Sequence, residues 1–241
     1  MVDDTRISAI VPVKRFSTAK SRLAAVLSEI ERARLARLMF EDVLDALALA
    51  NEFLAGVIVV TADESAAVLA RSRDAIVVLS SADNGINAAV ELAIRHIGGG
   101  RDDGVVVVPS DIPQLSAVDI AKAVATVASP RTMAIVPATE DGGTNLLAYR
   151  PADAALLRFG PHSFEQHCRA ALRAGVTPHV LNIAELGLDI DRPENLRAFL
   201  SLKSQTRTHA FLSAIHITKR LEQRSRRNMQ QLGCTAAGAL S

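Results

Sequence analysis

The sequence predicts an α/β fold, a three-layer α/β/α sandwich of the Rossmann type with a mostly parallel central sheet. Three observations lead to this prediction. Short apolar runs rich in β-branched residues recur along the chain, they are continuous rather than alternating, and stretches of helical period separate them. Continuous apolar runs are typical of strands buried on both faces of a parallel sheet. Strands that alternate with helices form a doubly wound sheet with helices on both sides.

The strands and helices follow one another in regular order from the N-terminus. Strands are expected at residues 7–13, 57–61, 76–79, 105–108, 133–136, 145–149 and 178–181. Helices are expected at residues 18–27, 31–50, 64–71, 87–97, 118–128, 164–174 and 194–202. Pro193 suits the first turn of the last helix, because proline has no amide hydrogen to donate there. In the long second helix Asp42 interrupts an otherwise apolar face.

The chain of 241 residues has a net charge of only +1, but its charges are unevenly distributed. Residues 1–202 hold 20 basic and 25 acidic residues, whereas residues 203–241 hold seven basic residues and one acid. No linker rich in proline, glycine or serine divides the first part. We therefore expect one domain over 1–202 and a basic C-terminal extension over 203–241. The extension is expected to be partly disordered, with a candidate helix at 209–217.

The composition excludes several classes of function. The near-neutral charge argues against a nucleic-acid partner for the body, and seven Phe, one Tyr and no Trp leave little for base stacking. Two cysteines are too few for a disulfide framework or a four-ligand zinc site. No apolar run reaches the roughly 18 residues of a membrane span, and the N-terminus does not resemble a secretory signal. A cytoplasmic protein without a membrane partner is expected.

The loop after the first strand, VPVKRFSTAKSRL, is rich in cations. It carries Lys14, Lys20 and Arg22, and in an open α/β sheet ligands bind at the carboxyl ends of the strands. A basic loop that leads into a helix at that edge suits a triphosphate. Neither a Walker A motif nor GxGxxG is present, which disfavours a P-loop or a dinucleotide site. A solvated basic loop without a ligand is the alternative.

Three aspartates lie where a divalent cation would be expected. Asp111 follows the valine-rich fourth strand, at the substrate end of the sheet. Asp189 and Asp191 are two positions apart, so in an extended segment their carboxylates point to the same side and repel each other unless a cation lies between them. Carboxylate oxygens are ligands that Mg²⁺ prefers. The alternative for Asp111 is a helix-capping role, for which Ser116 competes.

Two turns that contain glycine could bind an anion such as phosphate or carboxylate. EDGGTN includes Thr144, and FGPHSF contains Gly160 and Ser163 just before a helix. Free backbone N–H groups in such turns bind anions. The simpler explanation is structural, because Ser163 and Gln166 have the spacing of a capping box.

The segment NGINAAV opens another helix, with Gly85 and Asn87 at its start. Backbone beside a glycine can pack closely on a base or a ribose, and an ordinary loop and helix cap is an equally good explanation. His162 and His167 are five positions apart with no acid or cysteine in register, so a metal site there is a weak hypothesis.

Taken together, these blocks resemble the CofC/FbiD family. Their order is VPVK…AKSRL, NGINAAV, PSDIPQL, DGGTN, FGPHSFEQH and LDIDRPENL, and the resemblance covers residues from about 6 to 200. Members of that family are guanylyltransferases in the biosynthesis of the deazaflavin coenzyme F-420, related to the MobA-like nucleotidyltransferases. The combination of FGxxSFxxH with LDIDxPxxL is more specific than any single block.

The resemblance implies a nucleotidyltransferase fold of the GT-A-like type and the transfer of GMP from GTP to a phosphorylated three-carbon acid, with release of pyrophosphate. The acid is 2-phospho-L-lactate, phosphoenolpyruvate or 3-phospho-D-glycerate in different members, and the last two are favoured here. The implied ligands of Mg²⁺, or of Mn²⁺, are Asp111, Asp189 and Asp191. The implied substrate contacts are Thr144, Gly160 and Ser163 for the acceptor, Lys14, Lys20 and Arg22 for the GTP phosphates, and Gly85 and Asn87 for the nucleotide.

The chemistry that the resemblance implies agrees with these residue types. Lys14, Lys20 and Asp111 would act in catalysis by positioning phosphates and neutralising charge. No general base is required, because the acceptor phosphate is already ionised at neutral pH. The product is a labile phosphoanhydride, so a downstream transferase is an expected partner, and a homodimer is left open. The extension beyond about residue 202 has no counterpart in the family pattern.

Two other functions compete with this one. A molybdopterin-type nucleotidyltransferase would open with a glycine-rich loop resembling LAGGxSxRxG, whereas this chain has PVKRFSTAKSRL. A non-catalytic α/β binding protein has little reason to gather three carboxylates against Lys14 and Lys20. The loop sequence therefore favours the guanylyltransferase over the molybdopterin-type enzyme, and the aspartates favour it over the binding protein.

Overall fold

The computed structural model describes residues 6–98, 103–139, 141–152 and 154–226. One sheet contains β1 (Ile7–Val13), β2 (Gly56–Thr61), β3 (Ile76–Leu79), β4 (Gly104–Val107), β5 (Thr132–Pro137), β6 (Thr144–Tyr149) and β7 (Thr177–Val180). Its order is β3-β2-β1-β4-β6-β5-β7, and only β6 runs antiparallel to its neighbours. Each of these strands begins and ends within one residue of its predicted bounds. The mostly parallel sheet is confirmed.

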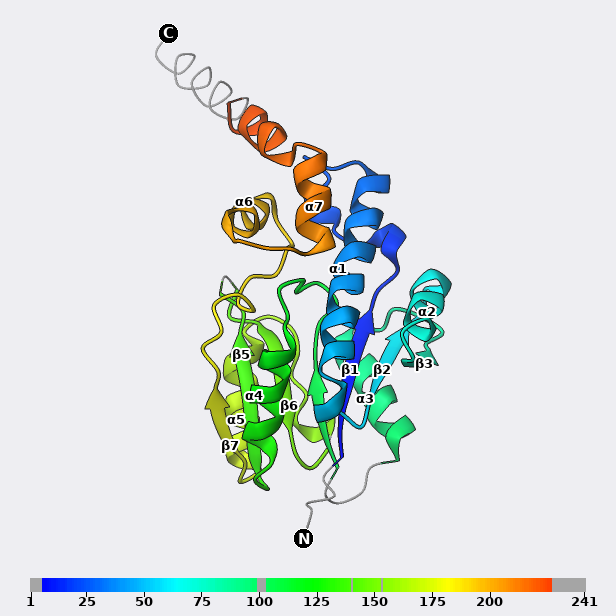
Figure 1. The fold of residues 1–241 in the computed structure, drawn as a ribbon. Coiled ribbons are helices and arrows are strands. Elements are labelled where there is room, and N and C mark those ends of the chain that lie inside the picture. The colour runs from blue at the N-terminus through cyan, green and yellow to red at the C-terminus, as the bar shows by residue number, and fades with distance from the viewer. Residues whose placement is uncertain (1–5, 99–102, 140, 153, 227–241) are drawn as a thin grey trace, which may run out of the picture.

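Helices cover both faces of this sheet (Figure 1). They are α1 (Glu29–Leu49), α2 (Glu64–Arg71), α3 (Ile86–Ile97), α4 (Ala117–Val127), α5 (Ser163–Arg173), α6 (Pro193–Ser201) and α7 (Arg207–Ala214). One apolar cluster joins the sheet to α1, α2 and α4, and a second cluster joins its other face to α3 and α5. Val11 of β1 belongs to the first cluster and Ile10 to the second. Successive strand residues are thus buried on opposite faces, which confirms the α/β/α sandwich.

The predicted helix at 18–27 does not form. Two short 3-10 turns, Phe16–Thr18 and Ser21–Leu23, take its place. Lys20 between them has φ 55°, in the left-handed region, which a continuous right-handed helix does not contain. The sequence gives no glycine or asparagine at this position to signal such a break.

The C-terminal extension begins with a helix that packs on the domain. Figure 1 shows α7 alongside α1, and Phe211 and Leu212 belong to the same apolar cluster as α1. Ile217 and Leu221 beyond α7 are also buried in that cluster. The core therefore continues past the boundary expected at 202, because α1 offers an apolar surface that these side chains cover. The expected disorder falls partly on 227–241, which lie outside the described residues.

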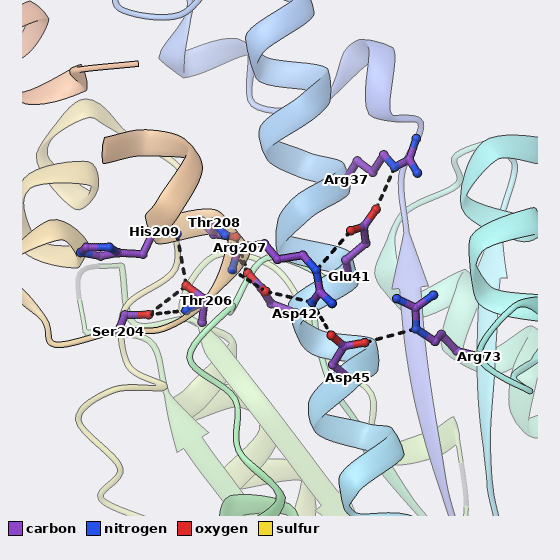
Figure 2. A network of polar contacts seen from close by, with 10 residues as sticks. All are labelled: Arg37, Glu41, Asp42, Asp45, Arg73, Ser204, Thr206, Arg207, Thr208 and His209. Carbon is purple, nitrogen blue, oxygen red and sulfur yellow. Dashed lines mark hydrogen bonds and ion pairs between the residues drawn. The ribbon is translucent and has the colours of Figure 1, made fainter. Parts of the chain in front are cut away.

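Asp42, the polar residue on the apolar face of α1, holds the start of α7 (Figure 2). Its carboxylate accepts hydrogen bonds from the backbone N–H groups of Arg207 (2.9 Å) and Thr208 (3.0 Å) and from the Thr208 hydroxyl (2.6 Å). A carboxylate at a helix N-terminus satisfies free N–H groups and the helix dipole. Asp42 thus caps a helix that lies 165 positions later in the chain.

Acidic residues of α1 also form ion pairs with basic residues of the C-terminal extension. The Arg207 guanidinium contacts Asp45, and Arg220 lies 2.9 Å from Glu31. The hydrogen bond from Arg220, which outweighs the effect of burial, lowers the pKa of Glu31 to about 2. Part of the net positive charge of the extension, seven basic residues against one acid, is therefore neutralised by acids of the domain. In the described part of the chain, no helix combines the length and apolarity needed to cross a membrane.

Candidate active site

A cavity of about 670 Å³ opens at the carboxyl ends of the first four strands. Lys14, Ala62, Ser80 and Asp111 line it, each shortly after β1, β2, β3 or β4 respectively. The order of the sheet reverses between β1 and β4, since β2 lies on the far side of β1. Such a switch point is where open α/β sheets bind ligands. Gly85, with φ 86°, lines the cavity as the N-cap of α3.

Lys20 joins two of the predicted aspartates across the mouth of the sheet. Its Nζ lies 2.7 Å from Asp111 Oδ2 and 3.6 Å from Asp191 Oδ1, and its side chain is only 7% exposed. Arg22 Nη1, from a largely exposed side chain, lies 2.5 Å from Asp191 Oδ2. The left-handed backbone at Lys20 interrupts the chain between the two 3-10 turns. From this position the Lys20 side chain reaches both carboxylates. We call Lys20, Asp111, Asp189 and Asp191 the charged cluster.

The charges of this cluster set its pKa values. Burial raises the pKa of Asp111, but the attraction and hydrogen bond of Lys20 outweigh burial and hold that pKa below its usual value. Burial likewise lowers the pKa of Lys20, and the three nearby carboxylates outweigh it, so the net shift is upward. Asp189 differs, because burial and then repulsion by Asp111 raise its pKa to about 6. Among the described residues Asp189 has no ion-pair partner, so one carboxylate of the cluster is not part of an ion pair.

The donor chemistry of the charged cluster fits a hard divalent cation. It offers carboxylate oxygens, and Asp189 lies near enough to Asp111 and Asp191 for their repulsion to add to the effect of burial on its pKa. In the described residues no three acids, histidines or cysteines already lie close enough to hold a metal ion. Lys20 occupies the space between Asp111 and Asp191 that a shared cation would need. The structure leaves the predicted metal role of these aspartates as a hypothesis.

The three predicted acceptor residues also come together, in a second and neutral cluster. Ser163 Oγ donates to Thr144 Oγ1 (3.1 Å), and the Ser163 N–H donates to the Gly160 carbonyl (3.2 Å). Thr144 Oγ1 lies 3.0 Å from Nδ1 of the fully buried His167. We call Thr144, Ser163 and His167 the neutral cluster. The capping box predicted for Ser163 and Gln166 is wrong, because His162 occupies the N-cap and Gln166 donates to the Pro161 carbonyl.

His167 is held on its other side as well. Its Nε2 accepts the backbone N–H of Arg158 at 2.9 Å, and its ring meets Phe159 edge-on at 4.8 Å. Burial, and then the charge of Arg158, lower the pKa of His167 to about 4. The imidazole is therefore neutral at physiological pH.

Asn87 does not line the cavity with Gly85. Its amide group donates to the Phe159 carbonyl and accepts the Phe159 N–H, both at 2.9 Å. It therefore ties the first turn of α3 to the loop that carries Gly160, and its predicted nucleotide contact stays a prediction. Ser116 caps α4 with Asp119 in a capping box, and Asp111 is free for the charged cluster.

Two contributors were missed from the sequence. Asn195 Oδ1 accepts the N–H groups of Arg192 (2.7 Å) and Asp191 (3.3 Å) and so shapes the segment that presents the paired aspartates. In LDIDRPENL, Asn195 comes three residues after Arg192, the residue that precedes the helix. This is the spacing of a capping box, so the sequence could have indicated this role of Asn195. His167 ends FGPHSFEQH, but nothing in that motif says which hydrogen bonds its ring makes.

Comparison with known proteins gives a consistent result. Residues 7–232 match a family model described as guanylyl transferase, CofC like. The chain is 38% identical to a phosphoenolpyruvate guanylyltransferase of Roseiflexus castenholzii, covering 78% of this chain and 85% of the relative. It is 36% identical to a 3-phospho-D-glycerate guanylyltransferase of Phenylobacterium zucineum (78% and 86%). It is 30% identical to a 2-phospho-L-lactate guanylyltransferase of Methanobrevibacter smithii (88% and 91%).

Solved structures support the fold. A candidate nucleotide-diphospho-sugar transferase from Desulfovibrio desulfuricans superimposes with a TM-score of 0.73 at 20% identity, covering 91% of this chain and 98% of that one. A nucleotidyl transferase from Methanothermobacter reaches 0.55 at 19% identity, covering 87% and 99%. These likenesses confirm the nucleotidyltransferase type of α/β fold that the sequence predicts.

Proposed function

Because the chain belongs to the CofC-like guanylyl transferase family, we propose that it transfers GMP from GTP to the phosphate of a three-carbon phospho-acid and releases pyrophosphate. The relatives act on phosphoenolpyruvate, 3-phospho-D-glycerate or 2-phospho-L-lactate. The higher identities are to enzymes for the first two acids, which we favour as substrates. We place the reaction in the cytoplasm, in the biosynthesis of coenzyme F-420.

One observation carries this proposal beyond family membership. Lys20, Asp111 and Asp191 come from three distant segments and meet in the cavity at the switch point of the sheet. Ion pairs that only stabilise a fold have no reason to gather there, whereas phosphate chemistry needs fixed charges at that edge. The cavity is also lined by Ile86, Ala89 and Leu92 of α3, and this apolar wall suits a nucleotide base.

The residues of the chain have separable tasks in this reaction. Lys14 and Lys20 bind the triphosphate and offset the charge that develops on pyrophosphate. Thr144, Gly160 and Ser163 orient the phospho-acid, whose ionised phosphate oxygen attacks the α-phosphorus without a general base. Asp111, Asp189 and Asp191 would hold Mg²⁺ or Mn²⁺, and such an ion supplies charge neutralisation at phosphate oxygens.

The test is a pyrophosphate assay with the purified full-length chain. The protein is incubated with GTP and each of the three acids, with Mg²⁺, with Mn²⁺ or with a chelator. We expect release with GTP and at least one acid, little release with ATP or CTP, and none after chelation. Release with none of the acids would contradict the proposed reaction, and undiminished release under chelation would contradict the metal role alone.

In the product a phosphoanhydride bond joins GMP to the phosphate of the three-carbon acid, and this bond is readily hydrolysed. An enzyme that consumes it by transferring the phospho-acid moiety is therefore the expected functional partner. Transfer of the phospho-acid moiety to the acceptor, with release of GMP, should be greater when such a transferase and its acceptor are present during the reaction than when they are added afterwards, because the free product hydrolyses in the meantime.

A further inference from the structure

His167 is a buried titratable side chain to which the proposed reaction assigns no task. It lies in the neutral cluster with Thr144 and Ser163, and none of these three residues lines the cavity that Lys20, Asp111 and Asp191 line. We propose that His167 is a positioning residue whose tautomer leaves the Thr144 hydroxyl hydrogen free to donate to an anionic oxygen of the acceptor acid. This inference rests on the proposed function, because it assumes that the acid binds at these residues.

The hydrogen bonds around the ring determine its tautomer. The backbone N–H of Arg158 can only donate, and it points at Nε2 from 2.9 Å. Nε2 therefore carries no hydrogen, and in a neutral imidazole the hydrogen must then be on Nδ1. Burial and the charge of Arg158 disfavour a second proton, and a hydrogen bond with the Ser163 main chain favours protonation to a smaller extent.

This tautomer fixes the direction of the hydrogen bond between His167 and Thr144, and the geometry of the contact between Ser163 and Thr144 makes Ser163 Oγ the donor there. Nδ1–H donates to Thr144 Oγ1 at 3.0 Å, and Ser163 Oγ donates to the same oxygen at 3.1 Å. Both lone pairs of the Thr144 oxygen are then occupied, and its own hydrogen must be donated elsewhere. Within the described residues, no side chain or carbonyl accepts that hydrogen.

The other tautomer would have the opposite effect. With a hydrogen on Nε2, Thr144 would donate to Nδ1 and Ser163 would donate to Thr144. Both hydroxyl hydrogens would then be used within the protein, and the cluster would offer an incoming anion only lone pairs. The Arg158 N–H thus acts through His167 to make Thr144 a donor.

An anionic oxygen is the partner that this arrangement fits. The Thr144 and Ser163 side chains are almost fully buried, at 6% and 1% exposure, where an unused donor costs free energy until it meets an acceptor. The same loop carries Arg158, close enough to affect the titration of His167. A carboxylate or phosphate oxygen of the acid would complete the pattern without any change of protonation.

The first test reads the tautomer directly in the full-length protein. Nitrogen-15 NMR of labelled histidine distinguishes a ring with its hydrogen on Nδ1 from one with its hydrogen on Nε2. The His167 signal is the one that disappears in His167→Asn or His167→Gln. We expect the Nδ1–H form at pH 7.5, and the Nε2–H form or a charged ring would overturn the proposal.

The second test uses two amide variants, each of which places a polar atom near one of the two ring nitrogens. His167→Asn retains an amide hydrogen near Nδ1, and His167→Gln retains an acceptor near Nε2. With wild-type activity established, we expect the KM for the acid to stay within about threefold in His167→Asn and to rise at least tenfold in His167→Gln. The KM for GTP should change in neither, and neither should it in the control His179→Gln on the exposed edge strand β7.

Equal effects of the two variants on the acid, or an equal rise for GTP, would mean that His167 is only a structural residue. Thr144→Val removes the hydroxyl on which His167 acts, so in that background the difference between Asn and Gln should vanish. Persistence of the difference there would also overturn the proposal. If the wild-type protein releases no pyrophosphate with any acid, the proposed function fails, and the NMR result still decides the tautomer.

Discussion

The charged cluster and the neutral cluster are prepared for oxygen anions in different ways. The first uses full charges: Lys20 pairs with Asp111 and Asp191, and Asp189 has no ion-pair partner among the described residues. The second uses oriented dipoles, with one hydroxyl hydrogen unused. The charged cluster is therefore incomplete by a charge, whereas the neutral cluster is incomplete by a single acceptor. This difference suits a reaction in which the triphosphate gains charge and the acid only has to be oriented.

The comparison predicts that the charged cluster carries more of the reaction. Charge that develops in a transition state responds strongly to fixed charges, whereas orientation by one neutral hydrogen bond contributes less. Substitutions in the charged cluster should lower kcat, and substitutions in the neutral cluster should raise the KM for the acid. The predictions below test this division, from the largest expected effect to the smallest.

The largest effect is expected at the paired aspartates. Asp189→Ala and Asp191→Ala should each lower pyrophosphate release by about 10³-fold or more, because each removes a charge from the site where the phosphates react. Both side chains are partly exposed, so the fold should persist, as circular dichroism and thermal unfolding can show. Full activity in both variants would contradict the assignment of the charged cluster to the reaction.

A smaller effect separates Lys20 from its neighbour Arg22. Lys20→Met should lower kcat by about 10²-fold, because it removes a buried cation that faces two carboxylates. Arg22→Met should change kcat by only a few fold, since its side chain is 62% exposed and solvent screens its ion pair. Steady-state kinetics with both substrates measures both variants. Similar losses of kcat in the two variants would show that solvent exposure does not determine how much each cation contributes to catalysis.

The two clusters also differ in how far the sequence predicts them. The carboxyl ends of parallel strands meet at one edge, so Lys14 and Asp111 could be brought to one site from strand positions alone. The left-handed backbone at Lys20 could not, because it depends on how the side chain reaches Asp111, 91 positions later. The ring contacts of His167 and the clamp of Asn87 on Phe159, 72 positions away, are likewise products of packing. Asp42 was visible as a break in a pattern, but its partner helix was not.

Ser163→Ala tests the neutral cluster with a smaller expected change. It removes one donor to Thr144, so the direction of the Thr144 hydrogen is less well fixed. We expect the KM for the acid to rise about tenfold, equivalent to about 1.4 kcal/mol, with the KM for GTP unchanged. Initial rates at varied acid and fixed GTP, and the reverse, give both values. An equal rise in both would place Ser163 outside the acceptor site.

The smallest effect concerns stability rather than turnover, and it follows from the neutrality of His167. The unfolded chain titrates this residue near pH 6.5, whereas in the folded protein its pKa is about 4. Between these values the unfolded state binds a proton that the folded state does not, so the free energy of unfolding falls as the pH drops, and the loss is complete below about pH 4. From pH 7.5 to pH 6 this amounts to about 0.8 kcal/mol.

Urea unfolding at these two pH values measures the effect, with His167→Gln as the variant that lacks the titrating ring. Other groups titrate equally in both proteins, so the difference between wild type and variant isolates His167. His179→Gln should behave as wild type because its side chain is exposed on β7. An identical pH dependence in wild type and His167→Gln would mean that the ring accepts a proton when folded. The contrast between a charged and a neutral cluster would then be lost, because the second cluster would become cationic as soon as an anion approached.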